Sequence, residues 1–105
     1  MASGEVEVPR VAENEHAIAI RDINPRSPVH VLIIPKVHIP TAGEVDDEHA
    51  STLTEMFALA QEVARLEKVS GSGYRLAMNV GDDAGMTISH LHMHVLGGRS
   101  LGPEG

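Results

Sequence analysis

The sequence predicts an α+β fold, an antiparallel sheet of about five strands with one long helix packed on one face. Short alternating or β-branched runs occur towards both ends of the chain, and a single long segment between them has apolar residues at helical spacing. Clusters of Gly, Pro, Asn and Asp separate these segments. With 105 residues, no internal repeat and no linker, the chain is expected to form one domain, residues 1–105.

The first half of the sheet is predicted from three segments. Residues 6–10 alternate apolar and charged side chains, and Pro9 favours an edge position or an irregular lead-in. Residues 16–20 form the next expected strand. Residues 30–35 are a nearly continuous apolar run, typical of a strand covered on both faces, and the proline-containing turn at 24–28 predicts a hairpin between these two strands.

The long helix is expected to start at residues 45–48, with Asp46 as its N-cap. Its last turn holds Lys68, and the Ser-Gly-Ser-Gly segment 70–73 ends it. One apolar stripe along the helix is expected to cover the sheet. The stripe consists of Leu53, Met56, Phe57, Ala60, Val63 and Ala64.

Two further strands complete the expected sheet. They span residues 74–80 and 88–96, and a polar, glycine-containing loop at 81–85 joins them. Gly97 and Gly98 end the second strand.

Composition excludes several classes of protein. The formal net charge of −7 argues against a long nucleic-acid footprint, because backbone binding depends on Lys and Arg. The absence of cysteine excludes disulfides and thiolate catalysis. No apolar run reaches the roughly 20 residues of a membrane span, and the first residues do not resemble a signal peptide. We therefore expect a cytoplasmic protein with no nucleic-acid or membrane partner.

The most informative stretch is the alternation of His90, His92 and His94 with apolar residues. On a strand, the three imidazoles share one face while the apolar residues enter the core. Such a face is merely solvated, binds a metal, or performs catalysis. His30 and His38 lie on or just after another expected strand, which disfavours the first interpretation.

A metal site is the second hypothesis, since imidazole is a common zinc ligand. His90 and His94 would start about 13 Å apart on a straight strand, however, and no carboxylate ligand occurs at short spacing. We expect no metal and no cofactor. The favoured hypothesis is catalysis on a phosphate ester or phosphoramidate, because a neutral imidazole attacks phosphorus near pH 7 when its other nitrogen is held by an acceptor.

These residues also resemble a known family. Residues 90–96, followed by Gly-Gly-Arg, fit the His-φ-His-φ-His-φ-φ pattern of the histidine triad (HIT) family in its nucleotide-binding branch. Residues 21–25, 30–39 and 79–85 resemble the other blocks of that family in the same order. The resemblance covers most of residues 10–102 and implies a HIT-like fold.

The resemblance implies a role for each matching catalytic position. His92 would be the nucleophile, forming a covalent nucleotidyl-histidine that water then hydrolyses. His94 would contact the α-phosphate, while His90 and His30 would hold the histidine network and its protons in place. Thr87 matches a Ser or Thr position near the leaving group.

The resemblance also implies a nucleotide site. Asp22 would bind the ribose hydroxyls with help from Asn79, and Ile20 and Ile23 would form the walls around the purine. Positions in the loop that follows, Gly85 and Met86, would complete the site.

Simpler interpretations remain for several of these residues. Asp22 could only cap the turn at residues 24–25, and Asn79 could only end a strand. His38 and His49 are interpreted as structural or exposed.

Some positions depart from the family pattern. Met86 stands where many members have Gln, and a thioether cannot donate the hydrogen bond of an amide, which disfavours dinucleoside polyphosphate cleavage. Ser89 replaces an often aromatic residue and Ala84 a frequent Gly. The amino-terminal helix of the family is largely absent, so a more open base pocket is expected.

Together these features predict a purine nucleotide-binding hydrolase that cleaves nucleoside 5′-phosphoramidates or related adenylyl conjugates. Its expected ligands are AMP, GMP or adenosine conjugates, and the resemblance to the family implies a homodimer whose strands join into one sheet. Two alternatives stay open: a dinucleoside polyphosphate hydrolase, and a nucleotide-binding or scaffold protein with incidental turnover.

Overall fold

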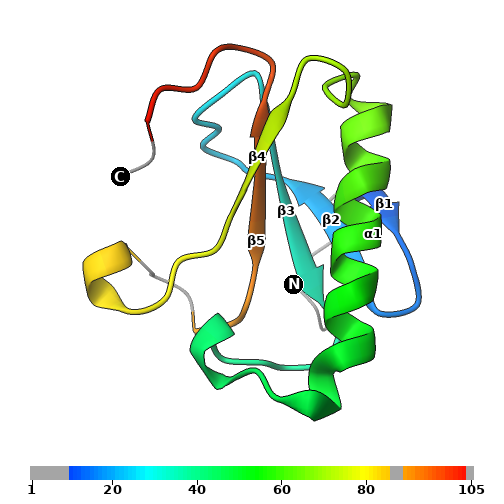
Figure 1. Ribbon diagram of the computed structural model, residues 1–105, viewed down its shortest axis with the longest axis vertical. Coiled ribbons are helices and arrows are strands. Elements are labelled where there is room, and N and C mark those ends of the chain that lie inside the picture. Colours follow the sequence, from blue (N-terminus) through cyan, green and yellow to red (C-terminus); the bar gives the residue numbers. More distant parts are fainter. Residues whose placement is uncertain (1–9, 86–88, 104–105) are drawn as a thin grey trace.

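A five-stranded antiparallel sheet forms one layer of the molecule, and the long helix α1 (Ala50–Leu66) forms the other (Figure 1). The computed structural model describes residues 10–85 and 89–103. The predicted α+β class, an antiparallel sheet with one long helix on one face, is confirmed. Across the sheet the strands follow the order β1 (Arg10–Glu13), β2 (Ala17–Arg21), β3 (Val29–Pro35), β5 (Met93–Gly97) and β4 (Tyr74–Ala77).

The predicted hairpin between the second and third segments is also present. β2 and β3 pair from Ala17↔Pro35 to Arg21↔Val31. Before β2, the side-chain oxygen of Asn14 accepts hydrogen bonds from the backbone N–H groups of His16 and Ala17, each at 2.9 Å, and so closes the turn after β1. The strand expected at residues 6–10 lies outside the described residues except for its last position, where β1 begins.

Helix α1 begins later than predicted. Asp46 does act as a cap, but of the short 3-10 helix η2 (Asp47–His49), where its carboxylate accepts from the N–H of Glu48 at 2.9 Å. Two other 3-10 helices occur among the described residues, η1 (Ala42–Glu44) and η3 (Asp82–Ala84). The 3-10 turn arises because an acidic cap and acidic first turn stabilise the chain before the apolar stripe begins.

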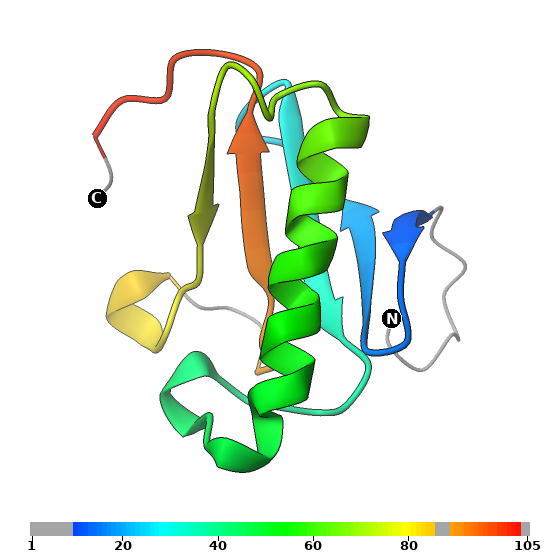
Figure 2. The same ribbon diagram turned by 45° about the vertical axis from the view of Figure 1, so that its right-hand side comes forward.

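The buried stripe of α1 differs from the expected one at two places, the first being that Thr52 is buried while Leu53 is only partly buried. Phe57 is 46% exposed, whereas Leu59 is buried. The residues that face the sheet recur at intervals of three or four from Thr52, and position 59 falls in this series while position 57 does not. The buried residues of α1 are Thr52, Met56, Leu59, Ala60, Val63 and Ala64. They pack on one face of the sheet, which α1 crosses from end to end in Figure 2.

The long histidine strand predicted at residues 88–96 is shorter than expected. β5 begins only at Met93, so His90 and His92 precede it, and residues 86–88 lie outside the described part of the chain. Pairing with β3 ends at Ile33↔Met93, and two residues later β3 reaches Pro35, which has no N–H to donate.

The backbone before β5 makes different bonds. The N–H of Leu91 donates to the carbonyl of Ile39 at 2.6 Å, outside the sheet. The strand predicted at 74–80 also ends early, at Ala77, where its pairing with β5 stops at Ala77↔His94, one residue from the start of β5.

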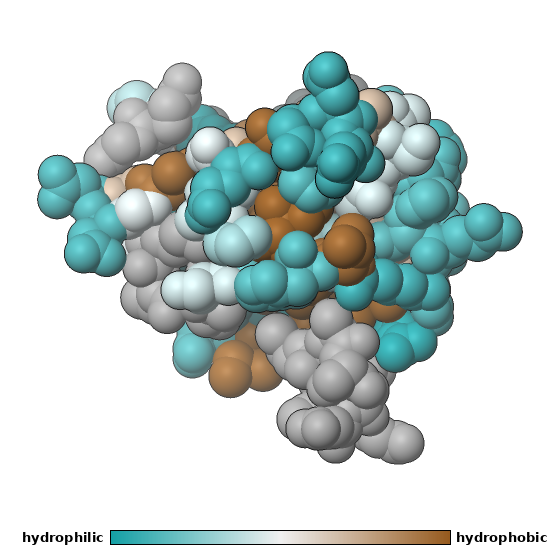
Figure 3. All heavy atoms as spheres, turned by 90° about the horizontal axis from the view of Figure 1, so that it is seen from below, coloured by the Kyte–Doolittle hydropathy of each residue, from teal (hydrophilic) through white to brown (hydrophobic). Residues whose placement is uncertain are grey.

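Hydrophilic residues cover much of the face seen in Figure 3. Viewed from below, apolar residues form separate patches between charged and polar side chains (Figure 3). Among the described residues, no helix combines the length and apolar character needed to cross a membrane.

Candidate functional site

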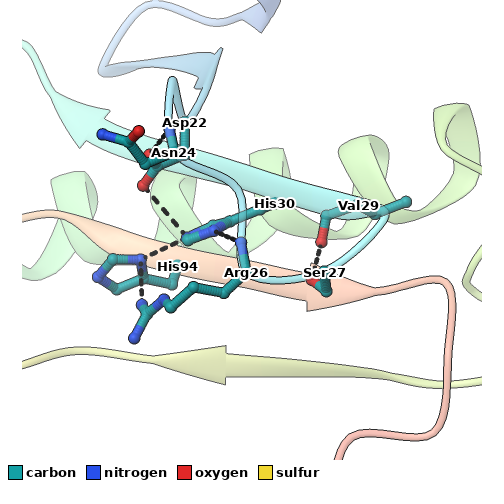
Figure 4. A network of polar contacts seen from close by, with 7 residues as sticks. All are labelled: Asp22, Asn24, Arg26, Ser27, Val29, His30 and His94. Atoms are coloured by element: carbon teal, nitrogen blue, oxygen red, sulfur yellow. Dashed lines mark hydrogen bonds and ion pairs between the residues drawn. The ribbon is translucent and has the colours of Figure 1, made fainter.

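Two histidines lie on the sheet face opposite α1. Side chains alternate along a strand, and Val31 and Val95 are buried under the helix, so His30 on β3 and His94 on β5 face the other way. The register places them diagonally across the two strands, with His30 opposite Leu96. His30 Nε2 lies 2.9 Å from His94 Nδ1, and the two residues are 3% and 6% exposed (Figure 4).

Backbone contacts determine which nitrogens of this pair carry protons. The N–H of Arg26 donates to His30 Nδ1 at 3.0 Å, so the proton of neutral His30 is on Nε2. His30 Nε2–H then donates to His94 Nδ1, which places the proton of His94 on its own Nε2. His94 Nε2 is buried and has no hydrogen-bond partner among the described residues. His94 therefore offers an unused N–H donor.

The electrostatic environment agrees with two neutral imidazoles. Burial lowers the pKa of His94 to about 4, and the neighbouring His92, His30 and Arg26 act in the same direction. Burial also lowers the pKa of His30, opposed by the carboxylate of Asp22. Near pH 7 both rings therefore remain uncharged.

His92 has the complementary arrangement. Its Nδ1 lies 2.9 Å from the backbone carbonyl of His90, and since a carbonyl can only accept, Nδ1 carries the proton. The lone pair is then on Nε2 of His92. The rings of His92 and His94 are 5.0 Å apart between centroids, so a nucleophilic nitrogen and an N–H donor belong to adjacent side chains.

His90 is held by two contacts, one of which sequence reasoning missed. Its Nε2 donates to the carbonyl of Pro35 at 3.2 Å, so its Nδ1 accepts from Nδ1 of His38 at 2.9 Å. His38, interpreted from the sequence as structural or exposed, is exposed and supports the residue whose carbonyl orients His92. Spacing along the chain could not show this contact, because it forms between two loops.

Asp22 combines the two interpretations left open by the sequence. One carboxylate oxygen accepts from the backbone N–H of Asn24 at 2.7 Å and caps the turn. The other oxygen lies 3.4 Å from His30 Nε2, next to the histidine network (Figure 4). The turn therefore places a carboxylate beside the imidazoles.

Arg26 belongs to the same network and was expected only as part of a turn. Its side chain extends from the loop between β2 and β3 towards His94, with Nη2 3.4 Å from His94 Nδ1 (Figure 4). Pro25 and Pro28, on either side of Arg26 in the sequence, indicated a turn, but they could not show where the guanidinium would point.

The predicted walls of the base pocket lie in different surroundings. Ile20 is buried on the sheet face with Ile18 and Ile34. Ile23 is 87% exposed and lines, with Asp22, an open cavity of about 460 Å³ whose lining does not include Ile20.

The remaining predicted site residues lie after β4. Asn79 is half-buried, and Gly85 ends η3 in a left-handed conformation, φ 81°. Neither takes part in the described contacts of the histidine network. Met86 and Thr87 lie outside the described residues.

One group of side chains could converge on a cation. Ligand atoms of Asp22, His30 and His94 lie within 4.8 Å of one another. His30 Nε2 and His94 Nδ1 already share a hydrogen bond, so a metal there would have to displace the proton between them.

Several known proteins are similar to this chain. A purine nucleoside phosphoramidase from Escherichia coli K12 is 44% identical over 93 residues, which cover 89% of this chain and 78% of that protein. The crystal structure of a HIT family hydrolase from Legionella pneumophila superposes with a TM-score of 0.91 at 41% identity, covering 95% of this chain and 89% of the other. A HIT family hydrolase from Clostridium thermocellum gives a TM-score of 0.92 at 44% identity, covering 97% and 89%.

The match extends over almost the whole sequence. The family model of the HIT domain matches residues 3–101, a span that contains the sheet, the helix and the histidine network. Together with the relatives above 40% identity, it shows that this chain belongs to the HIT family.

Proposed function

We propose that this protein hydrolyses purine nucleoside 5′-phosphoramidates, or related adenylyl conjugates, through a covalent nucleotidyl-His92 intermediate. The observation that carries the proposal is the pairing of a lone pair on His92 Nε2 with an unused N–H on His94 Nε2. A nucleophile next to a donor suits attack on a phosphoryl group whose oxygens gain charge. The name of the similar E. coli protein supports the substrate class.

In the first step, His92 Nε2 attacks phosphorus and forms a P–N bond. The bond to the leaving amine breaks, and the amine departs with its electron pair and takes up a proton relayed from water by the hydroxyl of Thr87. His94 Nε2–H donates to a non-bridging phosphoryl oxygen. The carbonyl of His90 stabilises the positive charge that develops on the His92 ring.

In the second step, water attacks phosphorus. The P–N bond to His92 breaks, its electron pair returns to Nε2, and the water molecule releases one proton to solvent. The products are a nucleoside monophosphate and the regenerated neutral imidazole. Throughout, His30 keeps His94 in the tautomer that donates.

For nucleotide binding we propose the positions implied by the family pattern. Asp22 and Asn79 bind the ribose, Ile20 and Ile23 contact a purine such as that of AMP or GMP, and the loop with Gly85 and Met86 approaches the phosphate. The exposure of Ile23 supports this, because a large apolar side chain that is 87% exposed gains from being covered by a base.

We also propose that the protein is a homodimer. β1 and β4 are the two edges of the sheet, and an edge strand offers backbone N–H and C=O groups to a second copy. Joining two sheets at such an edge would also bury more surface for a chain of only 105 residues.

Replacing the nucleophile tests the catalytic proposal. With adenosine 5′-phosphoramidate as substrate, we expect AMP release by the wild type and a loss of about a thousandfold or more in His92→Asn, because the covalent intermediate can no longer form on residue 92. AMP affinity measured by calorimetry should change little. His16→Asn, which alters a histidine just before β2, serves as the matched control.

Other outcomes separate the alternatives. Turnover that persists in His92→Asn contradicts the nucleophile assignment, and AMP binding without turnover by the wild type favours a scaffold protein. Faster cleavage of a dinucleoside polyphosphate than of the phosphoramidate favours that second hydrolase activity. Activity lost on exhaustive chelation and restored by a divalent metal would favour a metal-dependent mechanism at Asp22, His30 and His94.

A further inference from the structure

The backbone of Arg26 is held at both of its polar groups. Its N–H donates to His30 Nδ1 at 3.0 Å, and its carbonyl accepts from Nη2 of Arg99 at 2.9 Å. These contacts place the side chain of an otherwise exposed loop residue against the histidine network (Figure 4). A loop held in this way delivers a guanidinium to a defined position.

The contact between this guanidinium and His94 leaves most of its donors unused. His94 Nδ1 has one lone pair, which already accepts from His30 Nε2 at 2.9 Å, and Arg26 Nη2 stands further away at 3.4 Å. A guanidinium has five N–H donors and no acceptor. The same imidazole carries its own buried, unpartnered donor at Nε2.

Two sets of unused donors on adjacent side chains suit a ligand that only accepts. A phosphoryl group meets this requirement, and charge-assisted bonds from arginine to phosphate are among the strong hydrogen bonds of proteins. A positive charge here also offsets the carboxylate of Asp22, which lies 3.4 Å from His30 Nε2 and would repel an anion.

We propose that the Arg26 guanidinium binds the phosphoryl group of the nucleotide together with His94 Nε2–H, and that it makes the site discriminate between ligands by the charge of that group. The inference rests on the proposed function, in that it places a nucleotide phosphoryl group beside His94. On binding, Arg26 exchanges its long contact with His94 Nδ1 for bonds to phosphoryl oxygens. The preferred order of ligands is then a dianionic monophosphate, a monoanionic ester and an uncharged nucleoside.

Calorimetric binding of a charge series tests this proposal. The ligands are adenosine, the methyl ester of AMP and AMP, measured with the wild type, Arg26→Gln and Arg26→Lys. We expect Arg26→Gln to weaken AMP binding roughly 10- to 100-fold, to weaken the methyl ester less, and to leave adenosine unchanged. Arg26→Lys should retain part of the AMP affinity, since it keeps the charge but loses the fork of donors.

Arg65→Gln provides the matched control, because it removes the same charge from an exposed position on α1, on the opposite side of the sheet. All three affinities should stay at their wild-type values. Equal weakening of adenosine and AMP in Arg26→Gln would show a merely structural role and overturn the proposal, as would unchanged AMP affinity. If the wild type binds none of the three ligands, the proposal is also overturned.

The hydrolase proposal fails separately. A wild type that binds AMP through Arg26 yet releases no AMP from the phosphoramidate would contradict the proposed activity and support the role of Arg26. A wild type that turns over the phosphoramidate while Arg26→Gln keeps full AMP affinity would support the proposed activity and contradict the role of Arg26.

Discussion

The histidines differ in chemistry because each has a different hydrogen-bond partner. The backbone carbonyl next to His92 Nδ1 leaves a lone pair on Nε2 of that ring. The imidazole donor next to His94 Nδ1 instead leaves a proton on Nε2 of His94. The same residue type thus presents a lone pair at one position and an N–H donor two residues later. The backbone N–H of Arg26 starts this order, because it donates to His30 Nδ1 and so requires the lone pair at that nitrogen.

Buried neutral histidines predict that stability depends on pH. Burial lowers the pKa of His94 from 6.5 to about 4 and lowers that of His30 as well. Above pH 6.5 this contribution to stability is fully present. As the pH falls from 6.5 towards the folded-state pKa, the unfolded chain binds protons that the folded protein resists, and for His94 the loss approaches about 3 kcal/mol by the time the pH reaches about 4.

Urea unfolding measured between pH 7 and pH 5, where carboxylates contribute little, checks this expectation. The free energy of unfolding should fall across that range, and the fall should be shallower in His94→Asn than in the wild type. His16→Asn should keep the wild-type slope. Identical slopes in the wild type and His94→Asn would contradict the assignment of His94 as a buried neutral group.

Where each strand ends decides the shape of the site. β5 stops at Met93 instead of continuing back through the histidines, so His90 can turn its carbonyl towards His92 Nδ1 and its ring towards His38. In a continuous strand that carbonyl would have pointed towards a neighbouring strand and could not have accepted from His92 Nδ1. The loop between β2 and β3 similarly brings Asp22 and Arg26 to one network.

The end of β5 gives a prediction about this loop. Gly98 has φ 89°, and a Cβ added there would lie 2.9 Å from Cβ of Pro28, at the end of the loop that carries Arg26. Gly98→Ala should therefore lower the free energy of unfolding by roughly 1–3 kcal/mol, because the backbone is left-handed and the space is occupied. Thermal or urea unfolding measures the change.

Gly71→Ala is the appropriate comparison. A Cβ at Gly71 would meet nothing within 4 Å, and this glycine is not in the left-handed region, so little change in stability is expected. Similar destabilisation by both substitutions would argue against steric pressure on Pro28.

The two-layer arrangement separates stability from chemistry. α1 covers one face of the sheet and buries the larger apolar cluster, while the opposite face holds the smaller group Ile18, Ile20 and Ile34 beside the histidines. The positions of the imidazoles depend on the register of β3 and β5.

The proposed dimer is tested by mass. Light scattering coupled to gel filtration should give twice the chain mass of 11.2 kDa. The expectation follows from the resemblance to the HIT family and from the open edges at β1 and β4. A mass of one chain at micromolar concentration would contradict it.

The fold was largely predictable because its signals are local. Alternating and β-branched runs identified β2, β3 and β5, and the spacing of Met56, Ala60 and Val63 identified α1. Strand boundaries were harder to predict, because they depend on the neighbouring strand. β5 begins only at Met93, close to where β3 reaches Pro35 and lacks an N–H, and β4 stops pairing with β5 at His94.

For the site, the sequence by itself determined which imidazoles, carboxylate and loop glycines are available, and the HIT pattern assigned them expected roles. Only the tertiary structure decided the positions of the protons, because the partners at each ring nitrogen come from other loops and strands: Arg26 at His30, His38 at His90 and His30 at His94. A hydrogen bond depends on distance and direction in space, and neither can be derived from spacing along a chain.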